Sequence, residues 1–245
     1  MADPAEPAGP LVYPADAPAW LRDLVTATRG LSHRAFPRGA TRPQEQGRAA
    51  AVLMLFSDER DVLLLRRADS LGSHPGQVAF PGGAVDAHDE GPVQTALREA
   101  AEEVGVRQDA VHPLALFPEL HVPVSGFLVT PVLAHWRAPG SVSPLDAGET
   151  AEVARVPVDE LTDPANRFRV HHPSGYVGPA FSVSGLLVWG FTAGVLSGLL
   201  ELAGWDQPWN VADVRDLDSA LRAARVHREP SKTGPCRSDG AEVGA

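Results

Sequence analysis

Three glutamates in one short segment could bind a divalent cation. The segment 92–104 has the composition of a helix, and Glu99, Glu102 and Glu103 lie towards its end. An α-helix turns by about 100° per residue, so Glu99 and Glu103 are about 40° apart around its axis, with Glu102 beside them. Like charges at this spacing destabilise a helix. A hard cation such as Mg²⁺ would remove the repulsion because it prefers oxygen ligands, but a solvated acidic helix face explains the pattern equally well.

Two features next to these glutamates favour a metal site. Gly82 and Gly83 precede the helix, and glycines there let backbone groups approach a metal ion or a phosphate closely. Arg98 stands beside the acidic residues and could pair with Glu90 or Glu102, which would fix the orientation of the acidic group. The residue types therefore leave two interpretations open, and the glycines add weight to the cation site.

The stretch from residue 82 to 106 resembles the Nudix box, G-x5-E-x7-R-E-U-x-E-E-x-G-U, in which U is an apolar residue. The matching positions are Glu90, Arg98, Glu99, Glu102, Glu103, Gly105 and Val106. Two positions depart from the pattern, because Ala84 stands at the opening glycine and Ala100 at the apolar position after the first helical glutamate. The box covers about a tenth of the chain, and so many charged positions at fixed spacing are a specific signal.

The resemblance implies a hydrolase of nucleoside diphosphates linked to another moiety, with Mg²⁺ or Mn²⁺ as cofactor. By position, Glu99 and Glu103 would be the principal metal ligands. Glu102 would be a further ligand or the residue that activates water, and the carbonyl of Gly83 would be another metal contact. The chemistry is consistent, since hydrolysis of a pyrophosphate needs metal ions to neutralise its oxygens and to lower the pKa of the attacking water.

The resemblance also implies roles for charged residues other than the metal ligands. Arg98 and Glu90 would form an ion pair that supports the loop before the helix. Nudix enzymes often place a general base outside the box, and Glu149 and Glu152 lie where such a loop could be. We assign the catalytic role to Glu152, although a residue just before a strand could equally lie on the rim of the site.

A second stretch, residues 63–83, resembles the element that marks the coenzyme A pyrophosphatase branch of the family, roughly LLTxRSAxxxRxxxGxxxFPGG. The matching positions are Arg66, Ala68, Gly76, Phe80, Pro81, Gly82 and Gly83. The departures are Leu64 for threonine, Arg67 for serine and Gly72 for the second arginine. The resemblance implies cleavage of coenzyme A or a derivative into phosphopantetheine, or its acyl form, and adenosine bisphosphate.

Substrate contacts are expected in the loops on either side of the box. The candidates are Arg66, Arg67, His74, Gln77, Glu119 and His121. For His74, Glu119 and His121, an ordinary loop residue is an equally good interpretation. Because Gly72 replaces an expected phosphate contact, another nucleotide such as NADH, ADP-ribose or a sugar nucleotide is the alternative substrate. A Nudix-fold binding module without turnover is the alternative from a different class, and the intact glutamates argue against it.

The elements that must position these residues predict an α/β fold, the Nudix α/β/α sandwich with a mixed β-sheet. Strands are expected at 50–56, 61–67, 77–80, 114–117, 127–136, 152–156 and 176–183, and helices at 20–31, 92–104, 183–200 and 216–225. The segment 183–200 carries no charge and could be mistaken for a membrane span. We favour a buried helix, because the run is short for about 30 Å of hydrocarbon and lacks flanking basic residues.

Composition bounds the class of protein and its partners. The chain of 245 residues has a net charge of -10, which disfavours nucleic acid as a partner and suits a protein that gathers divalent cations. The partner that the resemblance implies is a small-molecule nucleotide. The single cysteine, Cys236, excludes a disulfide framework, and the single lysine, Lys232, excludes a P-loop. We expect an N-terminal arm with a short helix at 1–46, mobile over 1–18, a Nudix domain at 47–204, and an extension with a disordered tail at 205–245. No secretory signal or membrane partner is expected, so the predicted location is cytoplasmic, with a homodimer as a possible assembly.

Overall fold

The computed structural model describes residues 8–32, 36 and 47–228, which form two β-sheets and five α-helices. The helices are α1 (Arg22–Ala27), α2 (Pro92–Val104), α3 (Val158–Thr162), α4 (Gly190–Leu202) and α5 (Leu217–Arg228). The strands are β1 (Gly9–Pro10), β2 (Arg48–Ser57), β3 (Asp61–Arg67), β4 (Val78–Ala79), β5 (Gly82–Ala84), β6 (Val111–Leu116), β7 (Leu120–Val122), β8 (Phe127–Trp136), β9 (Thr150–Pro157), β10 (Arg167–His171), β11 (Val177–Val183), β12 (Leu186–Trp189) and β13 (Val214–Asp216).

The main sheet is mixed, as the sequence predicts. Its path runs β1-β6-β8-β2-β3-β4, with β5 paired to β2, β7 to β8 and β9 to β3. The central strands β2 and β8 run parallel over ten residue pairs, whereas the other pairings in this sheet are antiparallel. A parallel pair buried on both faces needs nearly continuous apolar sequence, which the runs in 50–56 and 127–136 provide.

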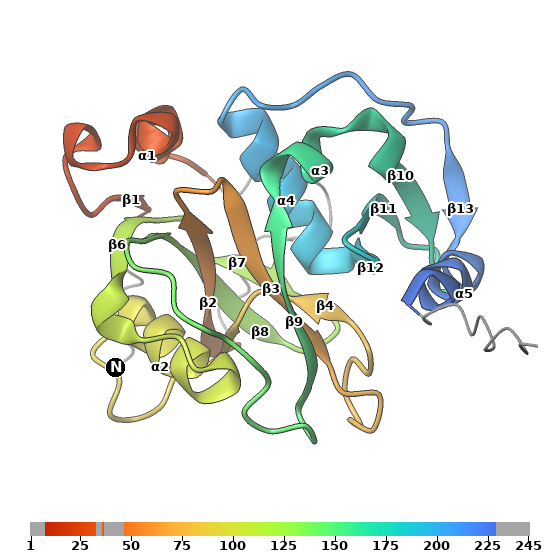
Figure 1. Cartoon of the computed structure of the whole chain (residues 1–245), viewed down its shortest axis with the longest axis horizontal. Helices are drawn as coiled ribbons and strands as arrows, with labels where there is room; N and C mark the ends of the chain where they lie inside the picture. Colours follow the sequence, from red (N-terminus) through yellow and green to blue (C-terminus); the bar gives the residue numbers. More distant parts are fainter. Residues whose placement is uncertain (1–7, 33–35, 37–46, 229–245) are drawn as a thin grey trace, which may run out of the picture.

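Helices cover both faces of this sheet, so the expected α/β/α sandwich is confirmed (Figure 1). Alternate residues of a strand point to opposite faces. The cluster beneath α2 includes Ala51, Leu53, Leu55, Leu63, Leu65, Ala96, Ala100 and Val104. The cluster on the other face, beneath α1 and α4, includes Leu24, Val25, Met54, Phe56, Val62, Leu64, Leu196 and Leu199. Strands β2 and β3 thus contribute to both cores, and α2 is fixed rigidly above one of them.

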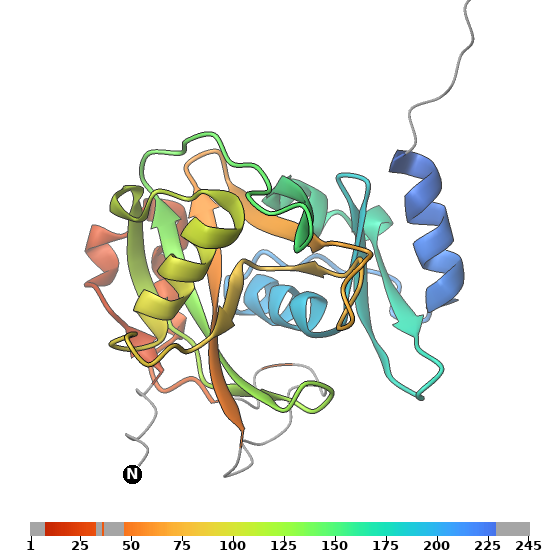
Figure 2. The same cartoon turned by 90° about the horizontal axis from the view of Figure 1, so that it is seen from below.

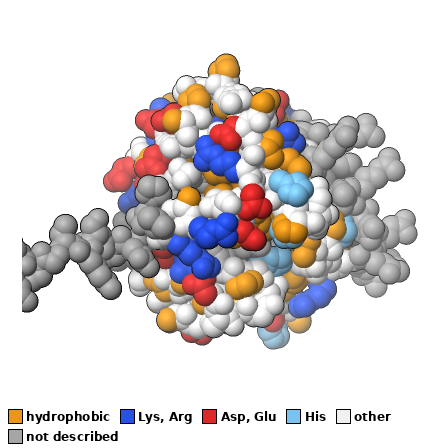
Figure 3. All heavy atoms as spheres, turned by 90° about the vertical axis from the view of Figure 1, so that its right-hand side faces the viewer, with side chains coloured by type: hydrophobic (Ala, Val, Ile, Leu, Met, Phe, Trp, Pro, Cys, Tyr) orange, Lys and Arg blue, Asp and Glu red, His pale blue; other side chains and the backbone are white. Residues whose placement is uncertain are grey.

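A second sheet, which local sequence patterns do not predict as a unit, follows the main one. Its order is β12-β11-β10-β13, with β13 parallel to β10 and the other pairs antiparallel. One face packs into the core beneath α4 through β11 and β12, and the other forms a small core with α5. Figure 2 shows α5 on the outer side of this sheet. Figure 3 looks onto this end of the molecule, where basic and acidic side chains lie next to one another.

The prediction of one helix at 183–200 is wrong. The segment 183–200 is not one helix: β11 ends at Val183, a tight turn follows at Ser184 and Gly185, β12 returns, and only then does α4 begin. Both turn residues have a positive φ, 48° and 73°, which reverses the chain into a hairpin. The glycine-containing apolar run looked helical because a buried strand and a buried helix share this composition. Among the described residues, no helix is long and apolar enough to cross a membrane.

The expectation of a mobile arm is also wrong for residues 8–18. Strand β1 pairs with the edge of β6, with Gly9 opposite Leu116, and the amide of Leu11 donates to the carbonyl of Leu114 at 2.9 Å. This pairing covers the edge of β6, whose backbone groups would otherwise be unpaired. Composition alone does not predict such a pairing. Residues 1–7 and the predicted tail at 229–245 lie outside the described residues, and the predicted domain limits stay predictions.

The position of α4 in the core gives a first test. Replacing Leu196 with alanine is expected to lower the free energy of unfolding by about 2–5 kcal/mol, because its side chain is 0% exposed and its loss leaves a cavity. Glu201→Ala, at an exposed position of the same helix, is the matched control and should change it by less than about 0.5 kcal/mol. Urea unfolding of both variants checks this, and equal effects would contradict the burial of α4.

Candidate active site on helix α2

Helix α2 begins and ends at the residues that the sequence predicts, and its ends explain why. Pro92 occupies the first turn, where its missing amide hydrogen costs nothing. Gly105 follows the last residue with φ 76°, a left-handed conformation that favours glycine, and its amide donates to the carbonyl of Ala101 at 3.1 Å. Because alanines and Val104 bury the opposite face in the core, the three glutamates are left on the outward side.

Strand β5 lies against the glutamates of α2, and its glycines make the close approach possible. A Cβ on Gly83 would lie 2.4 to 2.6 Å from the carboxyl atoms of Glu99, so the carboxylate occupies the space that a side chain would need. The amide of Gly82 donates to Oε2 of Glu103 at 2.9 Å. Gly82 itself has φ 157°, and a Cβ there would lie 2.3 Å from the carbonyl oxygen of Ala51. Two glutamates of one helix therefore meet the backbone of one strand.

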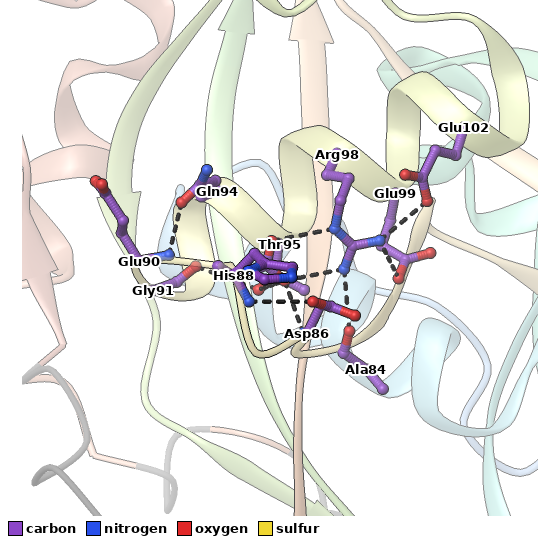
Figure 4. Close-up of polar contacts among 11 residues, drawn as sticks. Ala84, Asp86, His88, Glu90, Gly91, Gln94, Thr95, Arg98, Glu99 and Glu102 are labelled. Carbon is purple, nitrogen blue, oxygen red and sulfur yellow. Dashed lines mark hydrogen bonds and ion pairs between the residues drawn. The ribbon is translucent and has the colours of Figure 1, made fainter.

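Arg98 connects these carboxylates with the loop before the helix (Figure 4). Its Nη1 donates to Glu99 and to Glu102, each at 2.9 Å. Its Nε and Nη2 donate to the two oxygens of Asp89 at 3.1 and 2.9 Å, and Nη2 also reaches the carbonyl of Ala84 at 3.2 Å. One guanidinium thus offsets the charge of three carboxylates, two of which would otherwise repel each other across one turn.

The partner of Arg98 corrects the expected Arg98–Glu90 pair. In the structure the backbone amide of Glu90 donates to Oε1 of Gln94 at 2.6 Å, and the guanidinium of Arg98 binds Asp89 instead. The reason is that the glycine of the box pattern is Gly83, which packs against Glu99, and not the position of Ala84. In the pattern an acid follows this glycine by six residues, and that acid is Asp89. Eight residues, 90–97, then separate the acid from Arg98, against seven in the box pattern.

Asp89 is almost fully enclosed, with 2% of its side chain exposed. Besides Arg98, it accepts hydrogen bonds from the backbone amide of Asp86 and from Oγ1 of Thr95, both at 2.9 Å. The bond from Arg98 is the largest of several effects that hold the pKa of Asp89 well below its usual range, against the opposing effect of burial. The sequence contains a signal for this residue. Counted from Gly83, the acid of the G-x5-E spacing falls on Asp89.

The pKa values of two carboxylates on α2 are raised, whereas that of Asp89 is lowered. Burial raises the pKa of Glu99, although Arg98 opposes the shift. Burial likewise raises the pKa of Glu103 to about 7, with the Gly82 hydrogen bond opposing it. A carboxylate that loses hydration in this way is stabilised in its charged form by a nearby cation. Burial thus disfavours the charged forms of both Glu99 and Glu103.

The donor set fits a hard divalent cation, although the side chains are not gathered around one. Among the described residues, no three Asp, Glu, His or Cys side chains are grouped closely enough to form a metal site as they stand. Glu99 and Glu102 contact Arg98, and Glu103 contacts the Gly82 amide. All three offer carboxylate oxygens, the ligands that Mg²⁺ and Mn²⁺ prefer, beside a strand whose Gly83 leaves space for Glu99.

Arg67 and Glu149 are two charged residues outside α2 that act on Glu103. The charge of Arg67 lowers the pKa of Glu103, and the charge of Glu149 raises it, so both lie within electrostatic reach of that residue. The Nε atom of Arg67 is buried and has no hydrogen-bond partner within the described part of the chain. The backbone carbonyl of Glu149 accepts from the amide of Ala68 at 2.8 Å, which anchors its loop to the end of β3.

Other predicted site residues lie on β3, β9 and the loop after β3. Arg66 and Glu152 are opposite each other on β3 and β9, 3.7 Å apart, on the face that carries Leu64 and Ala154 rather than the face beneath α2. His74 lies in the loop between β3 and β4 with φ 53°, and its carbonyl accepts from the Gln77 amide at 3.3 Å. Their roles in catalysis and substrate binding stay predictions.

The last two candidates lie next to each other at strand β7. His121 is buried on β7 opposite Leu128 of β8, and Glu119 precedes the strand. Burial raises the pKa of Glu119. Their roles in substrate binding stay predictions.

The Asp89 contacts generate a prediction about stability. Asp89→Asn is expected to lower the free energy of unfolding by about 1–3 kcal/mol at pH 7, because charge-assisted hydrogen bonds to a buried group are lost. The pKa of Asp89 is depressed in the folded state, so its contribution is complete above the unfolded pKa of about 4 and is lost as the pH falls below it. The difference between wild type and variant should therefore shrink at pH 3.

Urea unfolding at the two pH values measures this difference. Glu90→Gln is the control, because its side chain makes no contact with Arg98, and it should behave like the wild type at both values. A larger loss of unfolding free energy in Glu90→Gln than in Asp89→Asn would contradict the Arg98–Asp89 ion pair and support the Arg98–Glu90 pair.

Comparison with known proteins agrees with this geometry. The family model of the NUDIX domain matches residues 45–176. The Nudix hydrolase NudL of Pectobacterium atrosepticum, whose name marks it as uncharacterized, is 45% identical over 121 residues, which are 49% of this chain and 62% of that protein. NudL of Photorhabdus laumondii, named in the same way, is 33% identical over 175 residues, 67% of this chain and 90% of that protein. A solved Nudix hydrolase from M. Smegmatis, RenU, is 23% identical, with a TM-score of 0.43 over 71% of this chain and 96% of its own.

These matches decide the family. The family model covers more than half of the chain, and the match to the Photorhabdus relative spans nearly all of that protein. The match to the Pectobacterium relative spans a little less than two thirds of that protein's length. Nudix hydrolases generally use divalent metal ions, in agreement with the carboxylates on α2. The chain is therefore a member of the Nudix hydrolase family.

Proposed function

We propose that this protein hydrolyses the phosphoanhydride of a nucleoside-diphosphate-linked substrate, namely coenzyme A or one of its derivatives, with Mg²⁺ or Mn²⁺ as cofactor. The observation that carries the proposal is the contact of Glu99 and Glu103 with the backbone of Gly82 and Gly83. Partly desolvated carboxylates next to a backbone without side chains provide the oxygen ligands that a cation needs and let a phosphate approach.

Each residue of the site has a role in this reaction. Glu99 and Glu103, with Glu102 and the carbonyl of Gly83, would hold the cation, which when bound would neutralise the phosphate oxygens and lower the pKa of the attacking water. Glu102 is the most exposed of the three glutamates, with 59% of its side chain accessible, and we assign it the acceptance of the proton from water. Glu149, within electrostatic reach of Glu103, is the alternative acceptor of this proton from outside the box.

Arg98 and Arg67 would act on charge and orientation. Arg98 holds Glu99 and Glu102 in one orientation through its two contacts at 2.9 Å, and Asp89 in turn holds Arg98. Arg67 lies near Glu103 with a buried Nε that lacks a partner in the described chain, so we assign it to a phosphate of the substrate. A guanidinium there would stabilise the negative charge that develops on the transferred phosphoryl group.

The identity of the substrate depends on the stretch before the box. The element from Arg66 to Gly83 resembles the coenzyme A branch, which supports coenzyme A. Gly72 stands where that branch has an arginine, which favours a second candidate, hydrolysis of NADH, ADP-ribose or a sugar nucleotide by the same site. Both candidates share the chemistry of the α2 carboxylates and differ only in what the loops hold.

Removing one carboxylate tests the chemistry. Glu103→Gln is expected to lower kcat about 100-fold or more, because a neutral amide is a poor ligand for a hard cation, while the fold is retained. Glu90→Gln, which changes a glutamate outside the site in the same way, should keep kcat within about twofold. Steady-state kinetics and circular dichroism of both variants measure this. Unchanged turnover in Glu103→Gln would refute the metal assignment.

A substrate panel tests the specificity. We expect the kcat/KM for coenzyme A to exceed the values for NADH, ADP-ribose and a sugar nucleotide by about tenfold or more with either Mg²⁺ or Mn²⁺, since one charged contact contributes about that factor. Detection of adenosine bisphosphate by chromatography identifies the bond that is cleaved. Faster turnover of another nucleotide would select the second candidate, and no turnover of any of them would favour a binding module.

A further inference from the structure

Arg66 contacts two carboxylates of the protein through Nη1 and Nε, although its buried Nε, like that of Arg67, makes no hydrogen bond within the described residues. Its Nη1 atom lies 3.0 Å from both carboxylate oxygens of Asp69, and its Nε atom lies 3.7 Å from Oε2 of Glu152. The side chain is only 16% exposed. A guanidinium held between two carboxylates has its charge offset by them, and it is thereby a weak partner for a phosphate.

The contact of Arg66 with Asp69 lies at the start of the loop 68–77, which joins β3 to β4. Arg66 is opposite Val78 in the antiparallel pairing of these strands, and the amide of Arg67 donates to the carbonyl of Gln77 at 2.9 Å. Asp69 begins the loop, so its contact with Arg66 holds the start of the loop against the strand. The loop carries His74 and Gln77, and it leads through β4 into the Gly82-Gly83 strand of the candidate active site.

Gly76 completes this arrangement by leaving space for it. A Cβ at this position would lie 2.6 Å from Oδ1 of Asp69 and 3.4 Å from Nη1 of Arg66. Its φ of 66° is also in the region that favours glycine. Gly72, in the same loop, has nothing within 4 Å of its added Cβ and no positive φ. The two glycines therefore differ sharply in what a methyl group would do.

The neighbouring strand shows why the position of this loop matters for the site. Glu152 of β9 is opposite Arg66, and the register shifts directly after that residue, so that Arg67 is opposite Thr150. Such a bulge re-aims the following side chain. Arg67 lies within electrostatic reach of Glu103. The residue before it, Arg66, lies on the opposite face of the sheet, with Leu64.

We propose that Arg66 is a positioning residue which, with Asp69 and Gly76, locks the loop 68–77 between Arg67 and the strands β4 and β5, and thereby sets the affinity for substrate. Arg66 is then not itself a substrate ligand, and Glu152 acts as its partner and not as a base. The statement about affinity rests on the proposed function, whereas the lock itself does not.

Hydrogen exchange combined with kinetics tests the lock. Arg66→Gln, Asp69→Asn and Gly76→Ala should each speed amide exchange in the peptides that cover 68–77 by about tenfold, equivalent to about 1.4 kcal/mol of local opening. In each, KM for coenzyme A should rise about tenfold while kcat stays within about threefold. Arg66→Lys should restore part of the protection, because it keeps the charge. Gly72→Ala is the matched control and should match the wild type in both measurements.

The outcomes separate the lock from the proposed function. Unchanged exchange in Arg66→Gln and Asp69→Asn would overturn the lock, as would a loss of kcat in Arg66→Gln that Asp69→Asn does not share, because that pattern marks a direct substrate contact. If the wild-type enzyme turns over no nucleotide, the proposed function fails, and the exchange data alone then support or overturn the lock.

Discussion

The guanidinium of Arg98 makes the acidic face of α2 possible. Glu99 and Glu102 would repel each other on adjacent turns, and Asp89 would be a buried charge without a partner, if this one cation did not contact all three. The same contacts join the loop before the helix to the helix itself, because Asp89 also binds the Asp86 amide and Thr95. Glu103, one turn from Glu99, makes no ion pair within the described residues; it accepts from the Gly82 amide and feels the charge of Arg67 at longer range. The charge of Glu103 is thus less fully offset by the protein than the charges that Arg98 contacts.

The sheet supplies the rigid platform for this charge arrangement. Strand β2 buries residues on both faces, so that α2 on one side and α4 on the other are fixed relative to the same backbone. Strand β5 pairs with the first half of β2, which places Gly82 and Gly83 directly under the glutamates. The alternation along β3 then separates two arginines that are adjacent in sequence: Arg67 lies within electrostatic reach of Glu103, whereas Arg66 contacts Asp69 and Glu152. Position along a strand, and not residue type alone, decides which carboxylates each arginine meets.

Local sequence signals predicted the elements that have clear ends. The bounds of α2 agree with the prediction because proline and glycine mark its two termini, and the strands at 61–67 and 127–136 agree because each is a continuous apolar run. The helix expected at 183–200 failed because a buried hairpin and a buried helix have the same composition, and β1 was missed because its pairing partner is about a hundred residues away. In the site, the three glutamates followed from helical spacing, whereas the Asp89 partner depended on which glycine packs against Glu99, a contact made in three dimensions.

The central claim is that the carboxylates of α2 form a divalent-cation site against the glycine strand. The most direct measurement is the binding of Mn²⁺ to the protein without substrate, followed by electron paramagnetic resonance, in the wild type and in a Glu99→Gln variant. The account predicts saturable binding to the wild type and affinity weakened by about tenfold or more in the variant, since one of few charged ligands is lost. Equal Mn²⁺ binding by the two proteins would contradict it, because the cation would then lie elsewhere and the acidic face of α2 would be no more than a solvated surface.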